Sequence, residues 1–306
     1  MSKKRIAIGT SLILSICILS AAPSVTSVSD GMKDFSVQLF DVIPNVAMQQ
    51  GVWPDAWIGK LVPSVPPHFG GGITLGMARL PMDGINRAIS QLNSVSDGAL
   101  PTLKDNLVFP TLTADIRIGG IFLPFDIGMS FMRIPNLNLS KLGADITVDF
   151  FTIGGSLRVP VLQEKLIIPA VSFGAGFMYS KGFVEVREAD NAYLRSDYKT
   201  KTIFLEAQVS KKILFLVPFV GFRGVVSDSI NSWKWQFNAA FNGYTVGQTQ
   251  SGTETRSLPD AFGESFQPQV FGGVGFDIFL VQTTISASYD FRNKIWGTNL
   301  SLRFKM

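Results

Sequence analysis

From about residue 107 onward, apolar and polar residues alternate along the chain with a period of two. In one such stretch, Val171, Phe173 and Ala175 are separated by a serine and a glycine. This alternation is typical of β-strands that have one apolar and one polar face. Counted back from the C-terminus, the pattern predicts about ten strands, with eight or twelve as the alternatives. The predicted strands are 68–80, 110–119, 124–134, 142–160, 168–181, 199–210, 213–226, 268–279, 283–291 and 296–306.

The connections between the predicted strands alternate in length. Short turns on one side and long loops on the other are typical of an all-β, up-and-down antiparallel transmembrane barrel. We therefore expect the longest loop, 227–267, to be extracellular. The short connections are predicted at 119–123, 162–167, 210–212 and 279–282, the longer ones at 135–141, 182–197 and 227–267, and one exceptional tight turn at 292–295.

Two places depart from the simple strand pattern. The pair Phe150-Phe151 breaks the alternation, which predicts a β-bulge at that point. Trp233, Trp235 and Phe237 alternate inside the longest loop, and they fit either a hairpin above the membrane or part of two further strands.

The last residues of the chain keep the alternation to the end. Leu300, Leu302, Phe304 and Met306 occupy every second position. This resembles the C-terminal insertion signal of bacterial outer-membrane β-barrel proteins, although Met306 stands where that family usually has an aromatic residue. The resemblance implies a location in the bacterial outer membrane, contact with its lipid, and recognition by the barrel-assembly machinery. Three short motifs further resemble uncharacterised barrels of spirochaetal type: Trp57-Ile58-Gly59, Pro66-Pro67-His68-Phe69-Gly70 and Leu123-Pro124-Phe125-Asp126-Ile127-Gly128.

The N-terminal part of the chain is organised differently. Three basic residues precede an apolar stretch at 6–19, and small residues follow it, which is the pattern of a secretory signal peptide over residues 1–22. Residues 23–67 form a separate segment, for which a periplasmic position and a plug in the barrel lumen are both open. Prolines at five positions argue against long regular elements in its second half, while 34–41 fits a short helix or a strand. After the first strand, the spacing of Ile85, Ala88, Ile89 and Leu92 predicts a helix over 82–93, in a loop on the long-loop side.

Composition narrows the functional classes. Hydrophobic residues make up 46% of the 306 positions, yet only 6–22 approaches the length of a membrane-spanning helix, which excludes a polytopic helical protein. The signal peptide holds three of the 27 basic residues and none of the 23 acidic ones, so the remaining chain has a formal charge of +1 and no nucleic-acid partner is expected. The only cysteine, Cys17, lies in the signal peptide, so disulfides and thiolate-bound metals are excluded, and we predict no cofactor.

The polar faces of the predicted strands carry many charged residues that we expect to line the lumen. One interpretation is a closed network in which these charges pair with one another, as burial requires. The other is a hydrated pore with a weak preference for cations. The predicted lumen-lining residues are Asp115, Arg117, Asp126, Asp145, Asp149, Arg158, Glu206, Arg223, Asp277, Asp290, Arg303 and Lys305.

Three functions are consistent with these patterns. The first is a narrow passive channel for ions or small solutes, because a barrel of about ten strands encloses little space. The second is a closed structural or adhesive barrel that presents its surface loops to host or surface ligands. The third is a membrane-embedded hydrolase that uses the single histidine, His68. We favour the channel and predict no enzymatic activity, because His68 lies at the short-turn end, away from the outer rim.

Overall fold

The computed structural model describes residues 25–49, 52–58, 68–95, 106–120, 125–138, 145–188, 192–237, 248–258, 263 and 265–306. The predicted signal peptide lies outside these residues. Within them are two helices, α1 (Val25–Ala47) and α2 (Asp83–Val95), and eleven strands. The strands are β1 (His68–Pro81), β2 (Asn106–Gly119), β3 (Asp126–Asn138), β4 (Asp145–Leu162), β5 (Ala170–Glu188), β6 (Ala192–Ser210), β7 (Leu216–Phe237), β8 (Gln248–Arg256), β9 (Gln267–Ile278), β10 (Val281–Asp290) and β11 (Ile295–Lys305).

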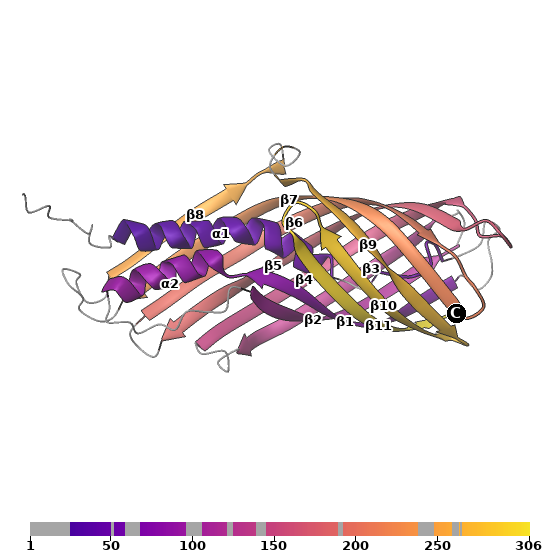
Figure 1. Cartoon of the computed structure of the whole chain (residues 1–306), viewed down its shortest axis with the longest axis horizontal. Coiled ribbons are helices and arrows are strands. Elements are labelled where there is room, and N and C mark those ends of the chain that lie inside the picture. Colours follow the sequence, from indigo (N-terminus) through magenta and orange to yellow (C-terminus); the bar gives the residue numbers. More distant parts are fainter. Residues whose placement is uncertain are drawn as a thin grey trace, which may run out of the picture.

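Ten of the described strands close into an antiparallel barrel, which confirms the predicted fold class and strand number. Each strand from β1 to β7 pairs with the next, β7 then pairs with β9, and β11 returns to pair with β1. β8 stands outside this ring and pairs only with the far half of β7, residues 229–237. Figure 1 shows the strands running obliquely along the long axis, with α1 and α2 at the end opposite the C-terminus.

Two of the predicted long connections are largely strand in the structure. β5 and β6 stay paired from Ala170 and Ser210 to Glu188 and Ala192, so the loop predicted at 182–197 is wrong. β7 likewise continues to Phe237 against β6, and β8 extends the same sheet. On the outward positions of these extensions, charged residues such as Glu185, Arg195 and Lys234 take the place of the apolar belt, so the sequence resembles a solvated loop. The extensions of β5, β6 and β7, together with β8, form a sheet that projects beyond the rest of the barrel. We call it the projecting sheet.

The bulge predicted at Phe150-Phe151 lies on the partner strand instead. The β3–β4 register holds to the Ile134–Phe150 pair and shifts directly after it, between Ile134 and Leu137 on β3. Pro135 lies at the shift, and a proline has no N–H to donate to a strand partner, so the irregularity falls on β3 and not on β4.

Helix α1 packs against the inward face of the projecting sheet. Its buried residues, including Phe35, Leu39 and Val42, form one hydrophobic cluster with inward residues such as Val148 and Trp235. Gln49 and residues 52–58 lie in the lumen. The sequence concealed this long helix, because Pro44 lies in its last turn, where the chain remains helical to Ala47.

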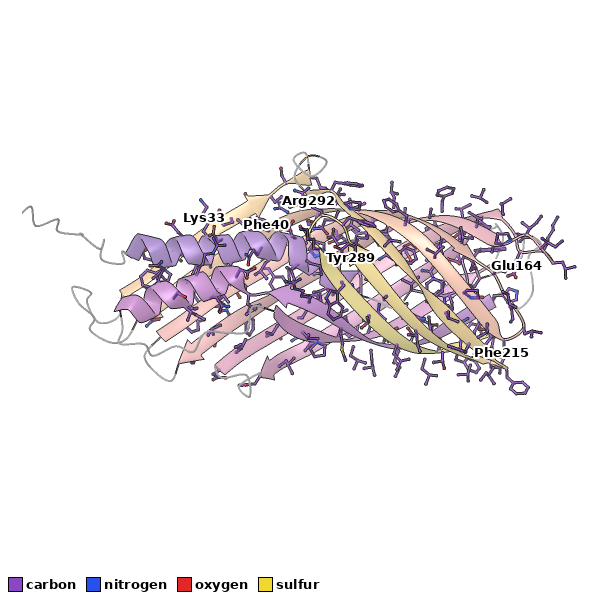
Figure 2. The ribbon with its side chains drawn as sticks, in the orientation of Figure 1. Lys33, Phe40, Glu164, Phe215, Tyr289 and Arg292 are labelled. Carbon is purple, nitrogen blue, oxygen red and sulfur yellow. The ribbon has the colours of Figure 1, made fainter. Side chains whose placement is uncertain are left out.

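Helix α2, predicted at 82–93, packs on α1 rather than on the barrel rim. The two helices approach closely at glycines: a Cβ on Gly31 would lie 2.7 Å from the backbone N of Ala88, and one on Gly84 would lie 2.7 Å from the Cα of Phe35. Lys33 and Phe40 mark the exposed and buried sides of α1 in Figure 2. α1 therefore lies on the projecting sheet, and α2 packs on α1.

The outer surface of the barrel is an apolar belt. Ile73 and Leu75 on β1, and Leu300 and Leu302 on β11, are examples of large hydrophobic side chains that are about half exposed. Their neighbours in sequence point inward and are mostly polar and buried, which is the reverse of a water-soluble sheet protein. Among the described residues, no helix is long and apolar enough to cross a membrane.

Candidate functional site: the barrel lumen

Ten of the twelve predicted lumen residues lie on the inward face of their strands. Seven of them form one triad and two pairs that cross between strands, two lie at the mouth near the short turns, and Asp290 binds Asn45 at the end of α1. The inward residues are Asp115, Arg117, Asp126, Arg158, Glu206, Arg223, Asp277, Asp290, Arg303 and Lys305. They come from eight strands, so charge is distributed around most of the wall.

Asp145 and Asp149 do not line the lumen. On β4 the inward residues at this level are Ile146, Val148 and Phe150, which pack in the hydrophobic cluster around α1. Asp145 therefore points outward and accepts a hydrogen bond from Asn138. Asp149 also points outward, where it pairs with Arg133 at 2.8 Å. The prediction assumed that the polar face of β4 is inward along its whole length. In the projecting part of β4, beyond the apolar belt, the inward residues are apolar and the outward residues are polar.

Asp126 is the centre of the most buried charge cluster. Its carboxylate accepts hydrogen bonds from Arg158 Nε at 3.0 Å and Nη2 at 2.8 Å, and it also pairs with Arg117. Arg117 continues to Ser156 Oγ at 2.7 Å. The side chains of Asp126 and Arg158 are 0% and 2% exposed. One buried carboxylate therefore supplies the counter-charge of two guanidinium groups.

A second pair lies across the seam where the barrel closes. Arg303 on β11 donates to both oxygens of Asp115 on β2, at 3.0–3.3 Å, and its guanidinium stacks 4.8 Å from the ring centre of Trp53. A third pair joins Arg223 to Glu206 at 2.9 Å, with the guanidinium near the rings of two phenylalanines.

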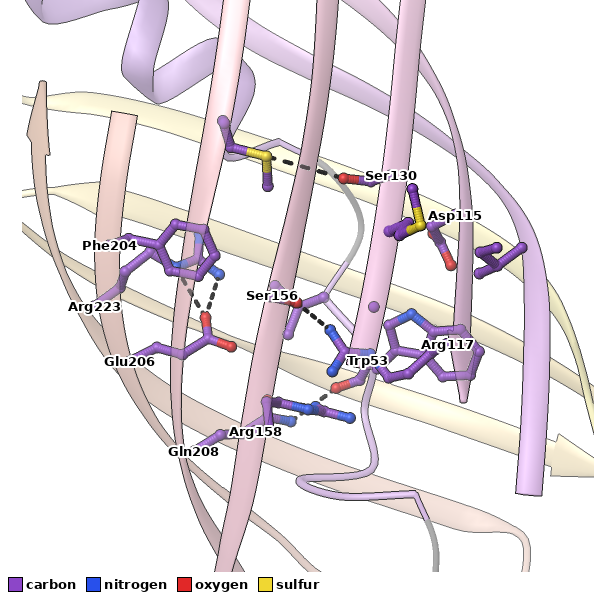
Figure 3. Close-up of a pocket in the computed structure, with 15 residues that line it drawn as sticks. Trp53, Asp115, Arg117, Ser130, Ser156, Arg158, Phe204, Glu206, Gln208 and Arg223 are labelled. Carbon is purple, nitrogen blue, oxygen red and sulfur yellow. Dashed lines mark hydrogen bonds and ion pairs between the residues drawn. The ribbon is translucent and has the colours of Figure 1, made fainter. Parts of the chain in front are cut away.

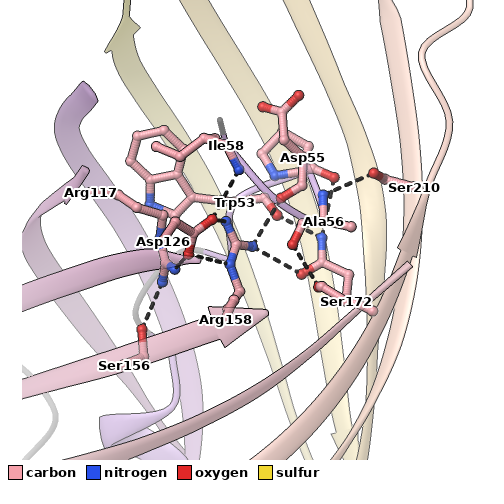
Figure 4. A network of polar contacts seen from close by, with 12 residues as sticks. Trp53, Asp55, Ala56, Ile58, Arg117, Asp126, Ser156, Arg158, Ser172 and Ser210 are labelled. Atoms are coloured by element: carbon pink, nitrogen blue, oxygen red, sulfur yellow. Dashed lines mark hydrogen bonds and ion pairs between the residues drawn. The ribbon is translucent and has the colours of Figure 1, made fainter. Parts of the chain in front are cut away.

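Residues 52–58 run through the middle of these charges. This segment has no regular secondary structure, and side chains of the wall satisfy its backbone (Figure 4). The contacts come from β3, β4, β5, β6 and β11. They are Ile58 N to Asp126 (2.9 Å), Arg158 to Asp55 O (2.9 Å), Ser172 to Ala56 O (2.6 Å), Gln208 to Trp53 O (2.8 Å), Ala56 N to Ser210 (2.8 Å) and Arg303 to Val52 O (3.2 Å).

The side chain of Asp55 anchors the segment at the mouth. Its Oδ2 accepts hydrogen bonds from Gln282 at 2.8 Å and from Lys305 at 2.9 Å. Lys305 also pairs with Asp277 at 2.9 Å, and Lys212 reaches the same oxygen of Asp277. The mouth is therefore crossed by an ion network that includes the N-terminal segment.

The end of α1 is held by neutral amides. Asn45 donates to Asp290 at 2.8 Å and to Gln267 at 3.2 Å, and it accepts from Gln269 at 2.8 Å. Gln49 donates to Ser288 at 3.0 Å. Gln267 and Gln269 stand on the inward face of a strand whose alternation is visible in the sequence. Their contact with α1 could not be predicted, because Asn45 lies more than 200 residues earlier in the chain.

The wall is also shaped to leave room for the segment. A Cβ on Gly70 would lie 2.7 Å from the indole of Trp53, and one on Gly275 would lie 2.6 Å from Pro54. Gly70 opens the run Gly70–Gly72 on β1, and Gly275 lies on β9. Their role is close approach of another chain segment, for which glycine is suited because it has no side chain.

The space that remains is small. A cavity of about 60 Å³ lies beside Trp53, between the Asp126 cluster and the Arg223–Glu206 pair (Figure 3). It has room for a few water molecules, since one water needs roughly 10–15 Å³ by this measure. Within the described part of the chain, no group of histidine, cysteine and acidic residues is arranged to hold a metal ion.

His68 lies at the short-turn end of β1, opposite Gly119. Its Nε2 is buried and makes no hydrogen bond to any residue that the structure describes. Among the residues that the structure describes, no nucleophile and no acid is hydrogen-bonded to this nitrogen.

A different surface lies on the outside of the projecting sheet. Arg195 stacks 3.9 Å from the ring centre of Phe183, and Arg187 and Lys234 flank the ring of Tyr193. The Asp197 carboxylate accepts hydrogen bonds from Arg195 and raises the pKa of that arginine above its ordinary value. The projecting sheet thus presents alternating cations and aromatic rings to its surroundings.

The predicted insertion signal is on β11. Leu300, Leu302 and Phe304 point outward in the apolar belt, and Met306 is half exposed at the end of the chain. The backbone of Met306 pairs with Phe69 on β1, so this strand completes the ring. Its recognition by the assembly machinery stays a prediction.

No protein-family model matches the chain, and no characterised protein matches it by sequence. Among solved structures, it is similar to the outer membrane protease OmpT from Escherichia coli, with 10% identity, a TM-score of 0.44, and coverage of 78% of this chain and 95% of that one. It is also similar to the translocator domain of the autotransporter NalP from Neisseria meningitidis, with 8% identity, a TM-score of 0.38, and coverage of 92% and 100%. The outer membrane protein Omp33 of Acinetobacter baumannii shows 9% identity, a TM-score of 0.30, and coverage of 78% and 99%. These values concern the fold alone, and the similarity to spirochaetal-type barrels stays a prediction.

Proposed function

We propose that this chain is a bacterial outer-membrane β-barrel that its own N-terminal segment, residues 25–58, keeps closed at rest. The membrane location is supported by the apolar belt, because half-exposed leucines and isoleucines around a closed sheet fit lipid and not water. The polar inward face fits the same arrangement.

The closed state is supported by one observation above all: residues 52–58 are hydrogen-bonded to five different wall strands. Irregular backbone at membrane depth is tolerated where the surrounding protein satisfies its polar groups, and the wall provides those partners here. In this state the barrel is a closed structural barrel, and the projecting sheet with α1 and α2 is the part that meets ligands.

A narrow channel is the second candidate. It is favoured by the charged wall, which is more polar than a permanently dry core requires. Ten strands enclose a lumen only slightly wider than that of eight-stranded barrels, which side chains fill. Conduction in this proposal requires that residues 52–58 leave the lumen.

Liposome swelling with sugars of graded size tests the closed state. Vesicles that contain the full chain should not swell, and vesicles with a variant lacking residues 25–58 should admit only the smallest solutes. Because this deletion also removes part of the hydrophobic cluster, a second variant keeps the segment and displaces it. Gly275→Val places side-chain atoms against Pro54, whereas Gly155→Ala, where a Cβ would lie 3.5 Å from the nearest atom, is the matched control. Swelling with the unmodified chain would contradict closure.

A further inference from the structure

Three neighbouring turns at the end opposite the helices carry large apolar residues at their tips. They connect β4 to β5, β6 to β7, and β9 to β10, and these strands are consecutive in the barrel wall. We call their tips the apolar turn rim, defined as Leu166, Ile167, Leu214, Phe215, Phe279 and Leu280. Figure 2 places Phe215, with Glu164 of the neighbouring turn, at the end far from Lys33.

The rim is exposed to an unusual degree. The exposed fractions are 95% for Leu166, 86% for Ile167, 84% for Leu214 and 101% for Phe279. Leu214 and Phe279 also have positive φ angles, 57° and 54°, a conformation that glycine and asparagine adopt far more readily than leucine or phenylalanine. Turn geometry therefore favours small polar residues at both positions, and large apolar side chains stand there instead.

The three turns are also fixed to one another. Lys211 donates to the carbonyl of Ile168 and pairs with Glu164 at 3.3 Å, which joins the first two turns. Lys212 pairs with Asp277 at 2.9 Å, which joins the second turn to the third. The charges of Lys211 and Lys212 are thus engaged by neighbouring turns, whereas Lys165 is exposed beside Leu166.

The dimensions of β6 indicate what covers the rim. On the outside of β6 the apolar stretch runs only from Ile203 to Val209, because Lys201 and Lys199 follow in the direction of the helices. At a rise of about 3.3 Å per residue and a tilt of about 40°, this stretch spans roughly 15 Å, whereas the apolar band of such barrels is about 25 Å tall. If the band is extended to Leu214, the same arithmetic gives about 28 Å.

We infer that the apolar turn rim is immersed in the inner leaflet of the same membrane, at the boundary between headgroups and acyl chains. This inference rests on the proposed membrane location. The surface is continuous with the apolar belt through Val209, Ile213 and Ile278, which are exposed on the same side. The exposed lysines 181, 199 and 201 then mark the outer boundary of the band, next to Tyr179. On this side of the membrane, the three turns therefore lie in the lipid boundary and not in water.

Single nitroxide labels test the inference directly, since the only cysteine of the full sequence, Cys17, lies in the predicted signal peptide. The remaining chain, with Leu214→Cys or Phe279→Cys, is labelled and folded into vesicles of phosphatidylethanolamine and phosphatidylglycerol. Collision rates with oxygen, which partitions into lipid, and with a water-soluble nickel complex are then measured. Ile285→Cys in the middle of the belt is the lipid control, and Lys234→Cys on the projecting sheet is the water control.

For labels at the rim, we expect a ratio of oxygen to nickel collision rates that is severalfold above that of Lys234→Cys and approaches that of Ile285→Cys. A rim ratio equal to that of Lys234→Cys, with Ile285→Cys in lipid, would overturn the inference and leave the rim as a water-facing contact surface for a periplasmic protein. If Ile285→Cys is also in water, the chain is not inserted, and the proposed membrane location itself fails.

Discussion

Removing the charge of Asp126 is the sharpest perturbation of the lumen. Asp126→Asn keeps the shape of the side chain but leaves Arg117 and Arg158 buried without their shared counter-charge. Breaking a buried ion pair by removing one partner typically costs about 3–5 kcal/mol, because the remaining charge stays desolvated. We expect a loss of this size in the free energy of unfolding, together with weaker binding of residues 52–58, since Ile58 N also donates to Asp126.

The assay is urea unfolding of the full chain in vesicles, followed by tryptophan fluorescence and by the gel mobility of the folded barrel. Trp53 lies inside the network, so fluorescence reports the N-terminal segment as well as the wall. The exposed pair Arg87–Asp34 supplies the control, because Arg87→Gln should cost only about 0–1 kcal/mol at such a site.

The double variant Asp126→Asn, Arg158→Gln tests whether the lost stability comes from the arginine charges that Asp126→Asn leaves buried. It removes one of the two orphaned charges, so part of the lost stability should return. A loss below about 1 kcal/mol for Asp126→Asn would refute the reasoning, because the arginines would then have water or another partner that compensates them.

Three further outcomes follow from the contacts. Gly275→Val should displace Pro54 and make vesicles permeable to small sugars, and unchanged impermeability would mean that the segment adapts in place. Asn45→Ala should lower the free energy of unfolding by about 1–3 kcal/mol, because Gln269 loses its acceptor and Asp290 a donor, and urea titration measures this. Asp145→Asn should change the free energy of unfolding by less than about 0.5 kcal/mol and leave permeability unchanged, since the side chain is exposed outside the barrel; a larger effect in either assay would return Asp145 to the lumen.

The alternation in sequence predicted the ring of strands well, because every strand in a barrel must separate lipid from lumen along its length. It failed above the belt, where the requirement reverses: Val148 is inward and Asp149 is outward. The period of two is the same in both regions, so the pattern alone does not say which phase is inside. Only the position of α1 decides this.

The candidate site was predicted in part. The charged residues of the wall stood out because charge is rare on these strands, and ten of the twelve face inward. Their partners could not be predicted, since Asp55 and Asn45 precede the barrel and contact strands more than 200 residues later. Pro44 concealed α1, because a proline normally ends a helix, whereas here it lies in the last turn.

Single-channel current across a planar bilayer tests the central claim most directly. With the full chain we expect no steady conductance steps, because residues 52–58 occupy the lumen. With a variant lacking these residues we expect small, steady steps, whose reversal potential in a salt gradient reports the charge preference of the wall. Steady steps from the full chain, of the same size as those of the shortened variant, would contradict the closed barrel.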